Sequence, residues 1–231
     1  MLDANNIYVS YGKSQVINGI SLHVNKGDKL AILGRNGVGK TTLLKSLIGI
    51  LPVSKGSIEL EKKNITKNSP HVRSRLGIAY VPQGREIIPD LTVEENLELG
   101  GDAHVKDLFA RRAEVMKYFP ALTVHLKRKG GVLSGGQQQQ LAIARALMSE
   151  PDILLLDEPT EGIQPNVIAE IGNILDRIRN EMGVTLVIVE QNLKFVKRFA
   201  DSYVIIQKGS VVSQGNMEEL SSKIINRYLA V

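Results

Sequence analysis

The chain has 231 residues and a net charge of +5, a length that suits one domain or one domain with an inserted lobe. It contains no cysteine, which excludes disulfide bonds, thiolate metal sites and a cysteine nucleophile. The lysines and arginines are scattered and form no basic helix with interleaved aromatic residues. The positive charge therefore indicates a solvated surface, and we expect no nucleic-acid partner.

The sequence shows no membrane-spanning segment. The longest apolar runs, such as residues 153–156, are far shorter than the roughly 20 residues that cross a bilayer. The first six residues have no positive region followed by an apolar stretch, so we expect no signal peptide. We expect a soluble protein that meets a membrane only through a partner.

Strand-like and helix-like segments alternate along the first third of the chain. In chain order, the patterns predict strands over residues 7–9, 16–24 and 29–33, a helix over 40–50, and strands over 56–60 and 78–81. The third strand is short, apolar and followed by Gly34, which is typical of a buried parallel strand.

Residues 84–149 differ from their surroundings because their pattern is mostly helical. Thr92 followed by Glu95 forms a capping box that opens a helix through Leu99, and residues 105–119 have helical apolar spacing. We interpret this stretch as an inserted helical lobe. Beyond it, the patterns predict a strand over 153–156, a helix over 166–181, a strand over 184–189 and a hairpin over 203–212. The alternation indicates an α/β fold.

A complete phosphate-binding loop follows the third predicted strand. Its residues are Gly34, Arg35, Asn36, Gly37, Val38, Gly39, Lys40 and Thr41, and we include the adjoining Thr42. Glycines let the backbone N–H groups point at phosphate oxygens, and the following helix adds its positive N-terminal end. Lys40 can reach the β- and γ-phosphates, and the Thr41 hydroxyl can bind Mg²⁺. A chance lysine in a glycine-rich turn would lack the flanking strand and helix.

Two carboxylates follow the buried strand at residues 153–156. Asp157 and Glu158 emerge where the carboxyl end of a strand in an open α/β sheet binds ligands. Asp157 would hold Mg²⁺ through water, and Glu158 would polarise the water that attacks the γ-phosphate. Many strands end in an acid, so this pattern gains its meaning from the phosphate loop before it.

The third motif is Leu133-Ser134-Gly135-Gly136-Gln137, which could also be an ordinary helix entry. With the two motifs above, in this order, it resembles the signature sequence of the ABC ATPases, and the resemblance covers essentially the whole chain. It implies a P-loop NTPase fold with a RecA-like core (residues 1–83 and 150–231), an N-terminal antiparallel β subdomain and a helical subdomain (84–149).

The resemblance also implies ATP and Mg²⁺ as cofactors and a second ABC ATPase subunit as a partner. Two copies would face each other head to tail, so that Ser134, the N–H groups of Gly135 and Gly136, and Gln137 face the other copy's γ-phosphate. Tyr11 matches the aromatic residue that stacks on adenine, although a lone tyrosine is more often core or surface. Gln83 matches the glutamine that reaches Mg²⁺ and the attacking water.

Two departures from the family pattern stand out. Gln191 occupies the position of a histidine that contacts the γ-phosphate, and no histidine follows His125. Glutamine can donate a hydrogen bond there but cannot take a proton. Residues 159–165 also differ from the loop of many relatives.

These departures resemble one branch of the family. Residues 80–86, 91–97, 161–165 and 189–192 are similar to the ATP-binding subunits of branched-chain amino acid and urea uptake systems, and residues 34–40 and 82–87 favour the urea member. This implies an importer motor, peripheral on the cytoplasmic face of the membrane. Its partners would be integral membrane permease subunits and, indirectly, an extracytoplasmic solute-binding protein.

Two other functions fit the sequence less well. ABC ATPases of DNA or ribosomes have two cassettes or a long coiled coil, whereas this chain shows one cassette and no sustained heptads. A nucleotide-dependent regulatory module with little turnover would not need Glu158, the residue expected to activate water.

Overall fold

The computed structural model describes residues 1–101 and 105–229, and its internal contacts divide the chain into two units. The first unit is Met1–Arg73 with Thr185–Val231, and the second is Ser74–Val184. Residues 102–104, in the predicted helical lobe, lie outside the described residues. The lobe boundaries at 84 and 149 remain a prediction, because the contact units divide the chain elsewhere.

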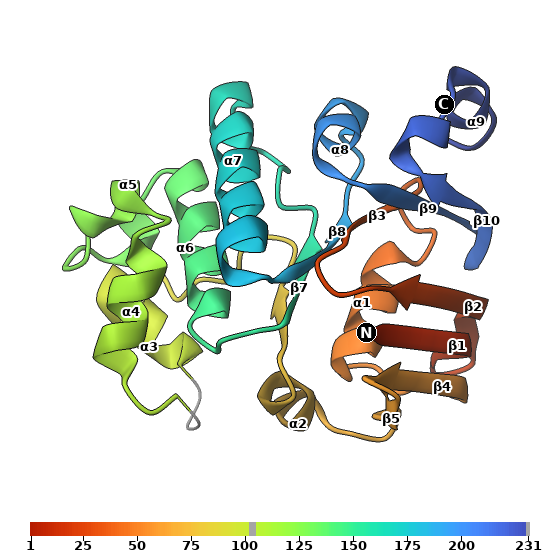
Figure 1. The fold of residues 1–231 in the computed structure, drawn as a ribbon, viewed down its shortest axis with the longest axis horizontal. Helices are drawn as coiled ribbons and strands as arrows, with labels where there is room; N and C mark the ends of the chain where they lie inside the picture. Colours follow the sequence, from red (N-terminus) through yellow and green to blue (C-terminus); the bar gives the residue numbers. More distant parts are fainter. Residues whose placement is uncertain (102–104, 230–231) are drawn as a thin grey trace. The chain divides into compact units, whose positions relative to one another are not determined.

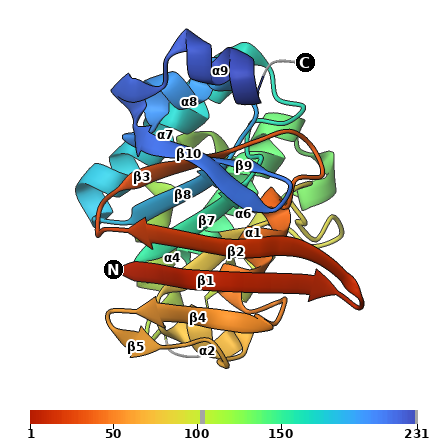
Figure 2. The ribbon, with the colours of Figure 1, turned by 90° about the vertical axis from the view of Figure 1, so that its right-hand side faces the viewer.

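An antiparallel sheet occupies the N-terminal part of the first unit. Its strands are β1 (Leu2–Tyr11), β2 (Ser14–Val24), β4 (Lys55–Leu60) and β5 (Lys63–Asn64), in the order β2-β1-β4-β5 (Figure 2). Alternate apolar side chains, among them Ile7, Val9 and Ile17, are fully buried. The N-terminal antiparallel sheet is therefore confirmed, with longer strands than the sequence predicted.

A second group of strands in this unit surrounds β3 (Lys29–Leu33). Strand β3 lies between β8 (Thr185–Val189) and β9 (Ser202–Gln207) and is parallel to both. Strand β10 (Ser210–Asn216) pairs antiparallel with β9. Neighbours on both sides explain why β3 is apolar along its length. The helices α1 (Lys40–Ile48), α8 (Leu193–Phe199) and α9 (Ser222–Tyr228) belong to the same unit (Figure 1).

Arg73, in α2 (Pro70–Arg75), supports the end of α1. Its side chain is 1% exposed and donates to the carbonyls of Ser46 (2.7 Å) and Leu47 (2.8 Å), and to those of Thr66 (2.8 Å) and Asn68 (3.1 Å). Burial lowers the pKa of this guanidinium. Arg73 thus provides partners for carbonyl groups that a helix end leaves unpaired.

The second unit contains the parallel pair β6 (Ile78–Val81) and β7 (Ile153–Asp157), in which Ile78 lies opposite Ile153. Its helices are α3 (Val93–Gly100), α4 (Leu108–Met116), α5 (Pro120–Thr123), α6 (Gly135–Leu147) and α7 (Pro165–Met182). The prediction of a mostly helical stretch is borne out among the described residues. The helix in residues 105–119 is shorter than their apolar spacing predicts. Helix α4 ends at Met116, and Pro120 begins the separate helix α5.

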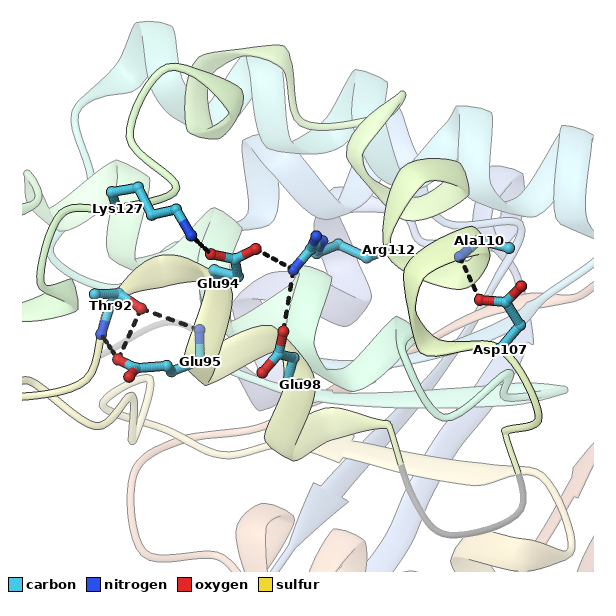
Figure 3. A network of polar contacts seen from close by, with 8 residues as sticks. All are labelled: Thr92, Glu94, Glu95, Glu98, Asp107, Ala110, Arg112 and Lys127. Atoms are coloured by element: carbon cyan, nitrogen blue, oxygen red, sulfur yellow. Dashed lines mark hydrogen bonds and ion pairs between the residues drawn. The ribbon is translucent and has the colours of Figure 1, made fainter.

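Helix α3 begins as predicted. Thr92 accepts from the N–H of Glu95, whose carboxylate accepts from the N–H of Thr92. Figure 3 shows the neighbouring network, in which Arg112 donates to Glu94 and Glu98 and Lys127 donates to Glu94. The bond from Lys127 is the main cause of the lowered pKa of Glu94. These contacts tie α3 to α4 and to the segment after α5.

No helix within residues 1–101 or 105–229 is long and apolar enough to cross a membrane.

Candidate functional site

The phosphate loop joins β3 to α1, and at two of its positions both backbone conformation and space require glycine. Gly34 has φ 154° and Gly39 has φ 110°, which L side chains rarely adopt. A Cβ atom on Gly34 would lie 2.5 Å from the Ile206 carbonyl oxygen, and one on Gly39 would lie 2.8 Å from Cδ1 of Ile17. Conformation and space therefore both favour glycine at these positions.

Lys40 is the first residue of α1 and lies across the loop. Its side chain is 5% exposed, and Nζ donates to the carbonyls of Gly34 (2.8 Å) and Arg35 (3.0 Å). The helix N-cap is Gly39, which has no side chain to accept from the first-turn N–H groups. A buried ammonium beside a helix N-terminus is a suitable environment for phosphate.

Gln191 lies beside this loop, within the same unit. Its Nε2 donates to Oδ1 of Asn36 at 2.6 Å. Glu190, 3% exposed, accepts the N–H groups of Gln191 (3.0 Å) and Asn192 (3.1 Å), which fixes the backbone after β8. A cavity of about 430 Å³ is lined by residues of both segments, among them Arg35, Asn36, Glu190 and Gln191.

Tyr11 ends β1 in the first unit and is 48% exposed. A ring this accessible is available for stacking.

Asp157 and Glu158 lie in the second unit at the end of β7. Asp157 is 1% exposed, and its Oδ2 accepts from the Tyr80 hydroxyl at 3.1 Å. Glu158 has φ 49°, an uncommon conformation for a residue other than glycine. The chain therefore turns sharply between the two carboxylates.

Gln83 contacts the predicted catalytic carboxylate directly. Its Nε2 lies 3.3 Å from Oε2 of Glu158 and 2.9 Å from Oε2 of Glu161. Gln83 follows β6 and Glu158 follows β7, so the parallel pairing of these strands brings their ends together. The structure thus joins two residues that the sequence separates by 75 positions.

The signature residues 134–137 begin helix α6. Ser134 is the N-cap: its hydroxyl accepts from the N–H of Gln137 at 3.3 Å, and Gln137 Oε1 accepts from the N–H of Ser134 at 3.0 Å. A Cβ atom on Gly136 would lie 2.5 Å from Cγ1 of Val167. Glycine therefore permits the close approach of α6 and α7 here.

Comparisons with known proteins show the family of this chain. Residues 17–161 match the family described as ABC transporter. The chain belongs to the ABC transporter family. The branched-chain amino acid transport ATP-binding protein BraG of Pseudomonas aeruginosa is 40% identical, over 99% of each chain. The probable branched-chain amino acid transport ATP-binding protein LivF of Archaeoglobus fulgidus is 35% identical, over 95% of this chain and 94% of its own.

A solved ABC cassette has the same fold. The structure of the ATP-binding cassette MJ0796 in a post-hydrolysis state, bound to ADP and Pi, matches with a TM-score of 0.85 and 25% identity, over 94% of this chain and 99% of its own. The predicted α/β ABC ATPase fold is confirmed. This ABC transporter subunit binds ATP and hydrolyses it.

The predicted site residues of this ABC cassette divide between the two units. The first unit holds the phosphate loop, Tyr11 and Gln191, and the second holds Gln83, residues 134–137, Asp157 and Glu158. Within the units, the structure joins Gln83 to Glu158 and Gln191 to Asn36.

Two contacts of the carboxylates in this ABC cassette were not predicted from the sequence. Tyr80 donates to Asp157, and Glu161 shares the amide of Gln83. Tyr80 stands opposite Leu155 in the β6–β7 pair. Only the pairing of the two strands reveals its proximity to Asp157, so no local sequence pattern could have indicated it.

Proposed function

We propose that this ABC subunit energises the uptake of branched-chain amino acids through separate membrane subunits, and that its residues act as follows. Lys40 and the loop N–H groups hold the β- and γ-phosphates, and Tyr11 stacks on adenine. Glu158 takes a proton from the attacking water. The observation that carries the hydrolytic role is the contact of Gln83 with Glu158 beside the buried Asp157.

Mg²⁺ fits the chemistry of the proposed donors. Asp157 offers a carboxylate, Thr41 a hydroxyl and Gln83 an amide oxygen, which are the hard oxygen ligands that this ion prefers. Asp157 is buried at a strand end and oriented by Tyr80. When bound, the ion would neutralise charge that develops on the phosphates.

A head-to-tail dimer is the second part of the proposal. MJ0796 has been solved as a dimeric cassette. In this chain, Ser134 caps α6, so its hydroxyl and the N–H groups of Gly135 and Gly136 gather at one helix start. These donors would face the γ-phosphate held by the other copy. Gln191, beside the phosphate loop, would contact the γ-phosphate of the ATP that its own chain binds.

The solute is assigned through relatives. Two relatives that match nearly the whole chain are named as branched-chain amino acid transport proteins, which favours these amino acids over urea. We propose membrane permease subunits as partners, a solute-binding protein as an indirect partner, and a position on the inner face of the membrane. The core and lobe division at residues 84 and 149 is part of the same proposal.

Uptake by a deletion strain tests this function. Loss of the gene should abolish high-affinity uptake of labelled leucine, isoleucine or valine and leave urea uptake unchanged. The wild-type gene should restore uptake, and Glu158→Gln should not. Loss of urea uptake alone would contradict the solute assignment, and loss of efflux of a lipid or drug would contradict the direction of transport.

A further inference from the structure

The loop after Gln83 has an unusual backbone. Gly84, Arg85 and Glu86 have φ values of 81°, 72° and 45°. Two of these residues carry side chains, for which left-handed conformations are unfavourable. Such a conformation persists only where surrounding contacts fix it.

Two arginines fix this loop to helix α6, which begins with the signature residues. Arg85 Nη1 donates to Oε1 of Gln138 at 3.2 Å. Arg145 Nη2 donates to the carbonyl of Glu86 at 2.8 Å. Arg85 extends from the loop to α6, and Arg145 extends from α6 to the loop. Two hydrogen bonds therefore join the loop to the helix.

The Arg85 guanidinium also fills space that two glycines leave open. Its Nη atoms lie 3.2 Å from the Cβ position of Gly135 and 3.8 Å from that of Gly162. Among residues 1–101 and 105–229, no carboxylate forms an ion pair with Arg85. A cation at the start of a helix is electrostatically unfavourable. Neither ion pairing nor the helix dipole therefore explains why Arg85 occupies this place.

The other end of the same loop contacts the carboxylates. Gln83, two residues before Arg85, donates to Glu158 and Glu161. Three residues of one short segment, Gln83, Arg85 and Glu86, therefore contact the proposed catalytic carboxylate, the loop that follows it and the signature helix.

We propose that Arg85 is a positioning residue that ties the loop of Gln83 to the signature helix. The proposal rests on the head-to-tail arrangement above. In that dimer, Gln83 and Glu158 serve the nucleotide of their own chain, whereas Ser134 serves the nucleotide of the other. A rigid link between them within one chain makes the two ATP sites respond together.

Cooperative ATP hydrolysis by the full chain tests the link. Arg85→Ala should lower the Hill coefficient from near 2, the limit for two sites, toward about 1. It should reduce kcat about tenfold or more, with less than about a twofold change in the ATP affinity of the monomer. Arg128→Ala, which removes an exposed arginine of the second unit, is the control and should leave both values unchanged.

Gln138→Ala provides an independent test if Arg85→Ala lowers the melting temperature. Removing the acceptor should cause the same loss of cooperativity, and the double variant should lose no more than either single variant. Fully additive losses, or wild-type cooperativity in Arg85→Ala, would overturn the link alone. If the wild-type protein itself hydrolyses ATP with a Hill coefficient near 1, the proposed dimer and the link are both overturned.

Discussion

Replacing Lys40 with Met tests the phosphate loop while keeping the long apolar stem of the side chain. The substitution removes a buried ammonium that now donates to the carbonyls of Gly34 and Arg35. A hydrogen bond to a charged group contributes about 1.5–3 kcal/mol. Because about 1.4 kcal/mol corresponds to a factor of ten, the loss of one such contact to phosphate should weaken ATP binding about 10- to 150-fold.

Equilibrium binding of ATP to monomeric protein, with Mg²⁺ omitted and then added, gives this ratio directly. Lys45→Met is the matched control, because Lys45 lies in the last turn of the same helix, away from the loop. The melting temperature of each variant without nucleotide shows whether the helix itself is intact.

Equal ATP affinity of Lys40→Met and the wild-type protein, at unchanged melting temperature, would show that Lys40 does not hold the phosphates. Equal weakening in Lys45→Met would also refute it, because the effect would then belong to the helix and not to the loop.

Three further predictions follow from named contacts. Ser134→Ala should leave ATP binding by the monomer nearly unchanged but impair ATP-driven dimerisation, measured by light scattering; an equal loss of monomer affinity would argue against the head-to-tail arrangement. Gln191→His should retain hydrolysis, whereas Gln191→Ala should lower turnover because the hydrogen bond to Asn36 is lost. If Gln191→Ala turns over ATP at the wild-type rate, the role of Gln191 is only structural. The hydrogen bond that His23 donates to the Asp3 carboxylate is the main cause of the raised pKa of His23, whose ordinary value is 6.5. The stabilisation from this bond should be present below about pH 6.5 and fade as the pH rises through the raised pKa. A difference in melting temperature between wild type and His23→Gln that does not change with pH would contradict this.

Elements with strong local patterns were predictable from the sequence. The capping box at Thr92 and the apolar strand before Gly34 each fix one element, and both are observed. The helix predicted over 40–50 ends earlier, at Ile48, because Gly49 adopts φ 87° and accommodates the helix end. A glycine in that place was a usable sign of the boundary.

The elements that the sequence analysis missed are short. Helices α2, α8 and α9 have six or seven residues each, too few for apolar periodicity to be distinct. The sequence around Arg73 does not distinguish it from an exposed basic residue, and only the fold shows that it is buried against α1. Likewise, nothing local indicates that Arg85 lies against Gly135.

The motif residues were predictable because their chemistry requires specific residue types at fixed spacing. Their mutual contacts were not, because they depend on strand pairing: Gln83 meets Glu158 through the register of β6 and β7. The roles assigned to these residues remain predictions.

The central claim is that Glu158 activates water in an ATP site closed by two copies of the chain. Turnover and ATP-dependent dimerisation of Glu158→Gln test it most directly, with Glu161→Gln as control because Gln83 contacts both carboxylates. Glu158→Gln should lose about 10²- to 10⁴-fold in turnover, the range of general base catalysis, while it binds ATP and accumulates as a dimer. Near wild-type turnover in Glu158→Gln, or an equal loss in Glu161→Gln, would contradict the account.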